Sequence, residues 1–521
     1  MSRSPFAFDW VLERAERAPG APCLGTPSDQ VSYGQLADRV RAFASTLQGR
    51  GVRAGDRVLI ALPNSPAAVV ASLAAQWLGA SAVEVSREWG EAALHQIATQ
   101  ARARVAVVLG RDAAAWGRAS AVERFFAVHS APIPERMAAA FGRPAEWLRE
   151  DGTLESPPGA GPPAVREASA PALIVYTSGS TGAPRGVIQT HRNVAANTVA
   201  ICEYLELTES DRAMAILPLF YCYGKSVLQT HLRAGGSVFF DHRFMYPRVV
   251  LEALGEQRCT GFAGVPLTFE LIRRQIDPGA LDLRSLRYVT QAGGAMHPET
   301  VRWARHAFRP ARLFVMYGQT EATARLSYLP PERAEDKEGS IGRGVRNVEL
   351  KVVREDGGEA VVGEEGHLVA RGESVTPGYF EAPEESAQVL RGGWLWTGDL
   401  ARRDADGFLF LTGRAKEMLK LGGHRVSPVE IEQALGSHPE VAEAAVVGMP
   451  DEVGGERACA VVVRRPDGAV TDAELKRHCR ERLPAFKVPK TIAFAAELPR
   501  TPAGKVARPE LKGFFPSEAG S

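Results

Sequence analysis

The chain of 521 residues contains little lysine. It has ten lysines against 52 arginines, and no lysine precedes Lys225. The basic and acidic totals, 62 and 61, nearly cancel and leave a formal net charge of +1. A chain without a strong excess of positive charge has no general attraction to nucleic acid or to an anionic membrane surface. The counts argue against a nucleic-acid-binding protein, and they raise the question of what each lysine does that arginine could not.

Cysteine is also scarce, and its spacing excludes two kinds of site. The six cysteines form no CxxC pair and no Cys/His cluster with the spacing of zinc ligands. We therefore predict reduced thiols rather than a disulfide framework or a structural metal. The first residues lack a basic region followed by an apolar one, and no apolar run approaches the roughly 18 residues of a membrane span. We expect a soluble cytoplasmic protein.

Helical and strand patterns alternate from residue 31 to about residue 108. The spacing of apolar residues predicts helices over Tyr33–Leu47 and Pro66–Leu78, and strands over Arg57–Leu62 and Arg104–Leu109. Such alternation is typical of βαβ units in a parallel sheet. The Pro- and Gly-rich stretch at residues 151–171 predicts a loop or linker.

The same alternation continues toward the middle of the chain and then changes. Further strands are predicted at Ala172–Tyr176, Ala213–Leu217, Ser237–Phe240, Gly261–Val265, Leu286–Gln291 and Arg312–Tyr317, and a helix begins near Asn193. From about residue 349, short strands among Gly and acidic turns indicate a smaller β-rich subdomain. After Gly413, a helix over Pro428–Gly436 and strands at Ala444–Val447 and Ala458–Val463 predict an α+β tail.

These patterns together predict an α/β protein with two domains. The large N-terminal domain, residues 1–415, consists of α/β subdomains and the small β-rich subdomain. The C-terminal domain, residues 416–521, is an α+β unit.

A polar segment follows the strand at Ala172–Tyr176. Residues 176–186 read YTSGSTGAPRG, in which hydroxyl side chains and glycines can bring donors close to a phosphate. The segment is not a Walker A loop: the only Gly-Lys-Ser, at residues 224–226, has Leu219 where that motif needs a glycine. No GxGxxG is present either, which disfavours the usual nucleotide-binding folds.

Five further segments follow this loop in a fixed order. They are QAGGA at residues 291–295, YGQTEA at 317–322, WTGDL at 396–400, GRAKEMLKLGG at 413–423 and PAGK at 502–505. In all six segments the sequence resembles the acyl-adenylate-forming superfamily, which comprises acyl- and aryl-CoA synthetases, adenylation domains of peptide synthetases, and luciferases. The order and spacing over most of the chain make this resemblance highly specific.

The resemblance implies a set of ATP-binding residues. The phosphate loop, which should hold the β- and γ-phosphates, contributes Thr177, Ser178, Gly179, Ser180, Thr181, Gly182 and Arg185. Gly293, Gly294 and Ala295 should form the wall against which adenine lies. In the segment Tyr317-Gly318-Gln-Thr320-Glu321, the tyrosine should stack on adenine and the threonine should bond the α-phosphate. The glutamate should hold Mg²⁺, which prefers carboxylate and phosphate oxygens.

The remaining segments supply the ribose contacts and the mobile tail. By resemblance, Asp399 accepts the ribose hydroxyls and Arg414 also reaches the ribose. Lys416 falls on the family's hinge, about which the tail rotates between adenylation and thioester formation. Lys505 is the expected catalytic lysine, because a compact ammonium can neutralise charge on both the carboxylate and the α-phosphate. Gly422 and Gly423 match the channel for the thiol arm, and Arg425 matches a phosphate-contacting arginine.

The acid pocket departs from the family pattern. Arg185 replaces a usual lysine, which still permits phosphate binding, and Tyr221 stands where CoA ligases often carry histidine. Peptide-synthetase adenylation domains usually place an aspartate near this point, but no acidic residue lies between Asp211 and Lys225, which disfavours an amino-acid substrate. The expected pocket residues are Tyr221, Tyr223, Gly224, Gly264 and Gln291. Lys225 either pairs with a second anionic group of the substrate or extends from a helix start to water, and we favour the second.

The sequence therefore predicts an enzyme that activates an acyl or aryl acid with Mg·ATP and passes it to a thiol. CoA and the phosphopantetheine of an acyl carrier protein both remain open as acceptors, and a homodimer remains open as the assembly. One alternative is an adenylating enzyme of secondary metabolism that uses a non-thiol nucleophile or an unusual acid. Another is a nucleotide-binding pseudoenzyme, which the joint presence of the ATP, magnesium and lysine motifs disfavours.

Overall fold

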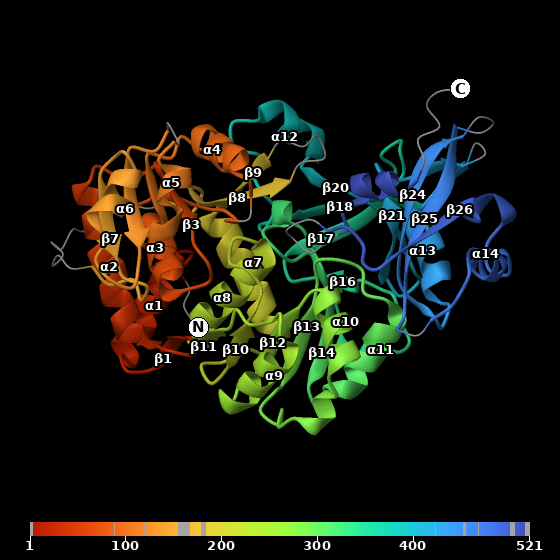
Figure 1. Ribbon diagram of the computed structural model, residues 1–521, viewed down its shortest axis with the longest axis horizontal. Coiled ribbons are helices and arrows are strands. Elements are labelled where there is room, and N and C mark those ends of the chain that lie inside the picture. Colours follow the sequence, from red (N-terminus) through yellow and green to blue (C-terminus); the bar gives the residue numbers. More distant parts are fainter. Residues whose placement is uncertain are drawn as a thin grey trace.

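A computed structural model describes residues 4–87, 89–118, 121–154, 167–178, 184–421, 424–451, 455–466, 468–500 and 506–515 of the chain. The described residues form four β-sheets (Figure 1). Two large, mostly parallel sheets with helices come first, and two smaller sheets follow toward the C-terminus. The predicted α/β fold with a β-rich subdomain and an α+β tail is confirmed. Most of the predicted linker at residues 151–171 lies outside the described residues.

The first sheet has seven strands in the order β7-β6-β5-β3-β4-β8-β9. They are β3 (Arg57–Ala61), β4 (Ser81–Glu84), β5 (Val105–Leu109), β6 (Arg124–Val128), β7 (Ala145–Leu148), β8 (Pro171–Ser178) and β9 (Pro184–Thr190). All neighbours are parallel except β8 and β9. The helices of this layer are α2 (Tyr33–Gly49), α3 (Pro66–Trp77), α4 (Glu91–Gln100), α5 (Ala113–Trp116) and α6 (Glu135–Ala140). Helix α3 is buried along its whole length, because it lies in the core that the first and second sheets share.

The second sheet has nine strands in the order β16-β15-β14-β13-β12-β10-β11-β1-β2. They are β1 (Pro22–Gly25), β2 (Gln30–Ser32), β10 (Arg212–Ala215), β11 (Ser237–Phe240), β12 (Gly261–Gly264), β13 (Tyr288–Gln291), β14 (Arg312–Tyr317), β15 (Ser327–Leu329) and β16 (Arg343–Gly344). The six neighbouring strands β1, β11, β10, β12, β13 and β14 are all parallel. The carboxyl ends of parallel strands meet at one edge of a sheet. The segments that follow β12, β13 and β14 therefore lie together.

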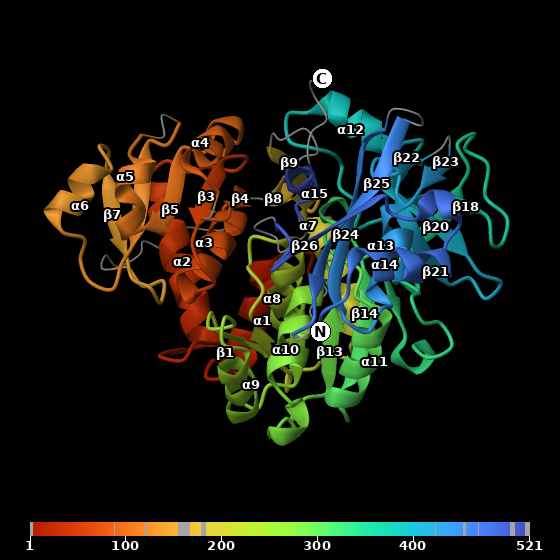
Figure 2. The ribbon, with the colours of Figure 1, turned by 45° about the vertical axis from the view of Figure 1, so that its right-hand side comes forward.

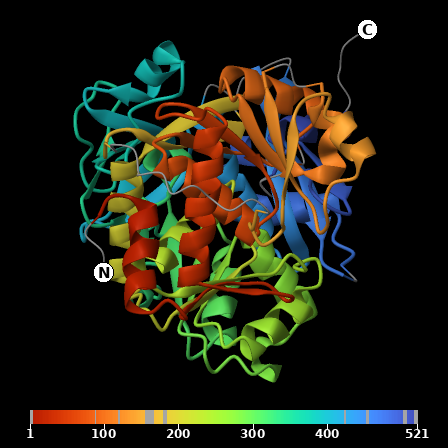
Figure 3. The ribbon, with the colours of Figure 1, turned by 90° about the vertical axis from the view of Figure 1, so that its left-hand side faces the viewer.

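Six helices accompany the second sheet. They are α1 (Ala7–Arg17), α7 (His191–Tyr204), α8 (Cys222–Ala234), α9 (Pro247–Glu256), α10 (Pro266–Gln275) and α11 (Pro298–Ala307). Helix α1 packs against α2 and α3 of the first layer and against α8 of the second, so the start of the chain joins the two layers (Figure 3).

The third and fourth sheets are smaller. The third contains β17 (Val348–Val353), β18 (Glu365–Gly372), β19 (Leu390–Arg391), β20 (Trp394–Arg403) and β21 (Leu409–Arg414), with helix α12 (Pro383–Val389). The fourth contains β22 (Leu419–Leu421), β23 (His424–Val426), β24 (Val441–Asp451), β25 (Gly455–Arg464) and β26 (Thr491–Ala495), with helices α13 (Pro428–Gly436), α14 (Asp472–Arg480) and α15 (Arg508–Leu511). A turn at residues 415–418 separates the two sheets, next to the predicted domain boundary at residues 415 and 416.

The fourth sheet lies on the side of the second sheet that carries α10 and α11 (Figure 2). Two ion pairs join them among the described residues. Arg274 lies 3.5 Å from Glu443, and Arg465 lies 3.4 Å from Glu299. Both involve partly exposed side chains. Such pairs contribute about 0–1 kcal/mol each, so they hold the C-terminal domain only weakly.

Most predicted elements are confirmed to within a few residues, including α2, α3, α13 and the strands β10 to β14 of the second sheet. Strands β1, β2, β15 and β16 of that sheet were not predicted. Strand β9 was not predicted. Its first residues, Pro184 and Gly186, indicated a loop, and the sequence was expected to pass from the Gly-rich segment directly to a helix. Strand β9 is at the edge of its sheet, where proline is tolerated because one row of backbone groups has no strand partner. None of the six cysteines forms a disulfide, as predicted.

Lys225 has neither of the two roles that the sequence suggested. It is 5% exposed, it does not line the cavity described below, and its ammonium bonds the carboxylate of Glu84, the last residue of β4. The Ser72 hydroxyl donates to the same carboxylate oxygen at 2.7 Å. Lys225 belongs to α8 of the second layer, and Glu84 and Ser72 belong to the first. The expectation that Lys225 extends to water is therefore wrong: it forms a buried ion pair between the two layers.

Replacement of Lys225 by methionine should lower the free energy of unfolding by about 3–5 kcal/mol, because the Glu84 carboxylate would remain buried without a partner. The double variant K225M/E84L should recover most of this loss, since both charges are removed together. Urea denaturation of the three proteins measures both effects. The control is Lys351→Met, whose ammonium lies 3.4 Å from Glu349 with 35% of its side chain exposed, and which should cost less than about 1 kcal/mol. A K225M protein as stable as the control would show that the buried pair does not hold the layers together.

Candidate functional site

The predicted phosphate loop connects two antiparallel strands. Thr177 and Ser178 end β8, and Arg185 is the second residue of β9. Thr177 pairs with Arg185 in the strand register, so the arginine stands at the base of the loop. Gly179, Ser180, Thr181 and Gly182 lie outside the described residues, as does the side chain of Ser178.

Arg185, Tyr379 and Glu321 form a cluster next to this loop. The guanidinium of Arg185 lies 6.0 Å from the centre of the Tyr379 ring, and the Tyr379 hydroxyl donates to Glu321 Oε1 at 2.8 Å. Burial raises the pKa of Tyr379, and the neighbouring Glu321 carboxylate raises it further. The tyrosine therefore stays protonated and remains a donor. The second carboxylate oxygen of Glu321 has no hydrogen-bond partner in the described part of the chain.

Glu321 fits a magnesium ion that is held mainly by phosphate and water. It is partly exposed at the start of a short 3₁₀ turn over Thr320–Ala322. No group of three or more His, Cys, Asp or Glu side chains in the described ranges could enclose a metal. Mg²⁺ bound with nucleotides commonly takes one or two protein carboxylates and keeps its other ligands as water and phosphate. A single oriented carboxylate with one open oxygen suits that arrangement.

Tyr379 was not among the site residues predicted from the sequence. The segment around it lies against β9: Phe380 donates its amide to Gly186 at 2.7 Å, and Ile188 donates its amide to Gly378 at 3.1 Å. These bonds orient the tyrosine toward Glu321. Residues 376–382 have no helical or strand periodicity, so the only sequence signal was an aromatic pair after a Pro-Gly turn.

Asp399 joins the nucleotide motifs of β14, β20 and β21. It is buried, and it stands opposite Arg414 in the register of β20 and β21. Arg414 Nε lies 2.8 Å from Asp399 Oδ1, and the Tyr317 hydroxyl donates to Oδ2 at 2.6 Å. Asp399 raises the pKa of Arg414, and burial together with Asp399 raises the pKa of Tyr317. Each carboxylate oxygen keeps a further lone pair, as the predicted ribose contact needs.

Thr320 connects the β14 segment to helix α8. Its hydroxyl donates to Cys222 Sγ at 3.5 Å. Sulfur is a weak acceptor, so the hydroxyl can turn to a stronger one such as phosphate. Gly318 is required in this segment because a Cβ there would lie 1.9 Å from the carbonyl oxygen of Ala324.

The predicted adenine wall is an exposed turn after β13. Gly293, Gly294 and Ala295 are all exposed, and Gly293 has a φ of +88°, which favours glycine. Gln291 is buried, and its side-chain amide donates to the Gly294 carbonyl at 2.8 Å. Gln291 therefore supports this turn from below.

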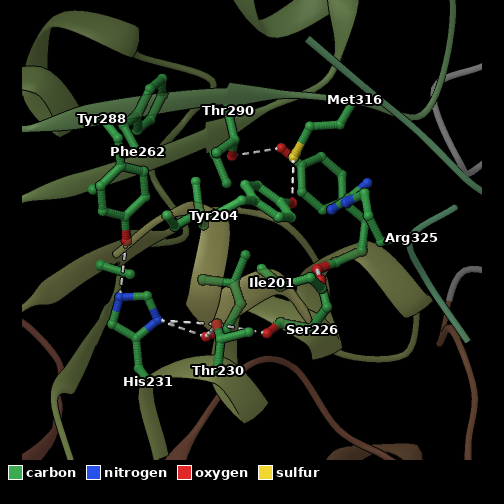
Figure 4. A pocket seen from close by; sticks show the side chains of 16 residues that line it. Ile201, Tyr204, Ser226, Thr230, His231, Phe262, Tyr288, Thr290, Met316 and Arg325 are labelled. Carbon is green, nitrogen blue, oxygen red and sulfur yellow. Dashed lines mark hydrogen bonds between the residues drawn. The ribbon is translucent and has the colours of Figure 1, made fainter. Parts of the chain in front are cut away.

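A cavity of about 20 Å³ lies between α7, α8 and the strands β12 to β14 (Figure 4). Of the five predicted pocket residues, Tyr223 lines it, and Tyr221, Gly224, Gly264 and Gln291 are not among its lining residues. Both glycines have packing roles: a Cβ on Gly224 would lie 2.2 Å from the Pro218 carbonyl, and one on Gly264 would lie 2.8 Å from Thr268. Tyr221 packs on Phe220 at the start of α8, with 4.4 Å between ring centres.

The tail residues are described only in part. Lys416 is exposed in the turn at residues 415–418, as a hinge requires. Gly422, Gly423 and Lys505 lie outside the described residues. Arg425 is in β23 opposite Lys420, and its side chain is not described. Arg500 and Val506, which flank the segment that carries Lys505, pair as an antiparallel bridge.

Two family models match the chain. The model for "AMP-binding enzyme" matches residues 11–380, and the model for "AMP-binding enzyme C-terminal domain" matches residues 430–505. Among characterised proteins, the chain is 31% identical over 506 residues to an indoleacetate–CoA ligase of Aromatoleum aromaticum, with 97% of each chain covered. It is 33% identical over 505 residues to a sulfoacetate–CoA ligase of Cupriavidus necator, with 96% of each chain covered.

Solved structures of similar architecture include ligand complexes. The o-succinylbenzoate CoA synthetase of Bacillus subtilis, solved with its acyl-adenylate intermediate, superposes with a TM-score of 0.83 at 27% identity, over 98% of this chain and 99% of that one. A second structure of that enzyme, with ATP and magnesium ion, also gives a TM-score of 0.83 and 27% identity, over 96% and 99%. An amide bond synthetase of Marinactinospora thermotolerans gives a TM-score of 0.84 at 27% identity, over 98% and 99%.

Among the helices of the described residues, none combines the length and the apolar character needed to cross a membrane.

Tyr379→Phe should weaken ATP binding in the presence of Mg²⁺ by about 10-fold, because a hydrogen bond to the charged Glu321 is lost. In excess chelator the variant and the parent should bind ATP equally well. Titration calorimetry under both conditions measures the difference, with Tyr246→Phe, a 68% exposed tyrosine, as the control. An equal loss with and without Mg²⁺ would show that Tyr379 does not act through Glu321.

Proposed function

The chain belongs to the family of AMP-binding enzymes, and we propose that it activates a carboxylic acid as an acyl-adenylate and transfers the acyl group to a thiol, in the first place CoA. The observation that carries this proposal is the assembly of Glu321, Thr320 and the Asp399–Arg414 pair at one edge of the second sheet. These groups are suited to a magnesium ion, an α-phosphate and a ribose. The relatives named as CoA ligases cover the chain almost from end to end, which supports the thiol as acceptor.

The first step forms the adenylate. A carboxylate oxygen of the acid attacks the α-phosphorus of ATP, a new phosphorus–oxygen bond forms, and the bond to the pyrophosphate oxygen breaks. Both reactants are anions, so positioned cations and donors provide most of the rate. Thr320 would donate to the α-phosphate, Arg185 would bind the outer phosphates, and Asp399 would hold the ribose. Magnesium, when bound at Glu321 with ATP, would neutralise phosphate charge.

The second step forms the thioester. The thiol sulfur attacks the acyl carbon of the adenylate, the carbon–oxygen bond to phosphate breaks, and AMP leaves with the electron pair. The two steps need different groups at one site, and a rotation of the C-terminal domain about Lys416 would exchange them. The exposed hinge turn and the few ion pairs to α10 and α11 support such a rotation.

The acceptor has a second candidate. A solved relative of equal structural similarity is an amide bond synthetase, which favours an amine as the alternative nucleophile. An acyl carrier protein would present the same thiol as CoA on its phosphopantetheine arm. We propose that the reaction takes place in the cytoplasm, where ATP and CoA are available. We also propose a homodimer as the assembly of the protein.

The residues that line the cavity narrow the chemical class of the acid substrate in one respect. The characterised relatives are named for acids as different as indoleacetate and sulfoacetate. Among the residues that line the cavity there is no aspartate or glutamate to pair with an amino group. This supports an acyl or aryl acid over an α-amino acid.

Exchange of labelled pyrophosphate into ATP should depend on an acid from a panel of aliphatic, aromatic, dicarboxylic and amino acids. Addition of CoA to the active acid should then produce thioester and AMP in equal amounts. A holo-carrier protein and a simple amine, each added in place of CoA, separate the acceptors. If the protein binds ATP but shows no exchange with any acid, the proposed enzymatic activity is refuted and the pseudoenzyme is favoured.

Lys505→Ala should lower acid-dependent exchange by about 10²-fold or more, the range seen when one donor to the transition state is removed. ATP binding should change much less, because the other phosphate contacts remain. Lys512→Ala, an exposed lysine close by in the same tail, is the matched control and should keep full exchange. Near-normal exchange in the Lys505 variant would remove this lysine from the mechanism.

A further inference from the structure

Arg325 is a buried arginine in the wall of the cavity (Figure 4). It is 2% exposed and follows the 3₁₀ turn that carries Thr320 and Glu321. Its backbone is fixed to helix α7: its amide donates to Asn197 Oδ1 at 3.2 Å, and its carbonyl accepts from Asn197 Nδ2 at 2.8 Å. The side chain lies over the Tyr223 ring, with the guanidinium carbon 5.0 Å from the ring centre.

The guanidinium of Arg325 has no carboxylate partner among the described residues. Its Nε has no hydrogen-bond acceptor there either. Other buried charges in the protein are paired: Lys225 bonds Glu84, and Asp211 bonds Arg287. Arginine stays protonated in proteins, and an isolated buried charge is costly. A cation over one tyrosine ring is only partly compensated.

The cavity offers donors around Arg325 and no negative charge. The Tyr204 hydroxyl accepts a hydrogen bond from Arg325 and donates to the sulfur of Met316 at 3.0 Å, and sulfur is a weak acceptor. The one other ionisable base on the wall, His231, has its pKa lowered by burial and is therefore uncharged near neutral pH. Arg325 is thus the only charged side chain among the described residues that line the cavity.

The cavity lies directly behind the proposed reaction site. Three residues show this. Thr290 and Met316 line the cavity and immediately precede the adenine-wall segment and Tyr317. Tyr223, also in the wall, follows Cys222, whose sulfur accepts from Thr320. An acid whose carboxyl group lies at Thr320 would place its next atoms along this wall.

We propose that Arg325 binds a second oxyanion of the acid substrate, a carboxylate or a sulfonate. A guanidinium pairs with either group through two parallel hydrogen bonds, and the Tyr204 hydroxyl can turn from Met316 to the same group. The cavity of about 20 Å³ suits a small polar group better than an aromatic ring. The substrate class is thus a short acid with two anionic groups. This inference rests on the proposed function.

The first test compares acids of matched length in the exchange assay. Malonate, succinate and sulfoacetate should be used with a kcat/KM at least about 10²-fold above that of acetate, propionate and butyrate. Arg325→Met should reduce that preference by about 10²-fold, because the anion would lose its charged partner. Arg325→Lys should retain part of it. Arg346→Met, which removes an arginine that is 59% exposed and paired with Glu203, is the control and should leave the preference unchanged.

The second test needs no turnover. Malonate or sulfoacetate without nucleotide should raise the melting temperature of the parent protein more than acetate does at equal ionic strength, and this difference should vanish in the Met variant. The parent protein alone can refute the inference: a preference for acids with one carboxyl group, or no difference between malonate and acetate, overturns it. Those outcomes leave the proposed function intact, whereas exchange with no acid at all refutes the proposed function itself.

Discussion

The buried pair between Lys225 and Glu84 fixes helix α8 against the first sheet, and the site depends on the place of that helix. Three residues in the first turn of this helix each make a contact on which the site depends. Cys222 accepts the Thr320 hydroxyl, Tyr223 forms a wall of the cavity, and Lys225 bonds Glu84 at the end of β4. A shift of α8 would therefore change the phosphate contact and the cavity together. A buried ion pair adds little net stability, but its strict geometry selects one packing of two layers.

Two buried cations, Lys225 and Arg325, are arranged in opposite ways. Lys225 is neutralised within the protein by a carboxylate that also accepts from Ser72, whereas Arg325 lies over the Tyr223 ring and has no carboxylate partner among the described residues. A compact ammonium suits a single close carboxylate oxygen, and a planar guanidinium suits a two-oxygen ligand that arrives from outside. The scarcity of lysine in this chain makes its use at residue 225 informative. Because the positive charge of Arg325 has no carboxylate partner among the described residues, it favours an acid substrate with a second anionic group.

Much of the fold and of the nucleotide site could be predicted because both depend on local patterns in short segments of the sequence. Alternating apolar runs predicted the parallel strands, and the motifs after β13 and β14 predicted where Gly293, Thr320 and Glu321 would lie. The misses depend on contacts between distant segments. Tyr379 reaches Glu321 only because residues 376–382 lie along β9, and Lys225 meets Glu84 only when two layers close. Neither contact has a local pattern in the sequence.

The weak attachment of the C-terminal domain follows from the same distribution of charges. The pairs at Lys225, Asp399 and Asp211 lie within the large domain, and the carboxylate of each pair is buried. The pairs that join the two domains, Arg274 with Glu443 and Arg465 with Glu299, are longer and partly exposed, so salt and water weaken them. A domain held in this way can leave its position at small cost, while the nucleotide groups stay in place. The large domain therefore provides a rigid site, and the moving parts of the proposed cycle are confined to the tail beyond Lys416.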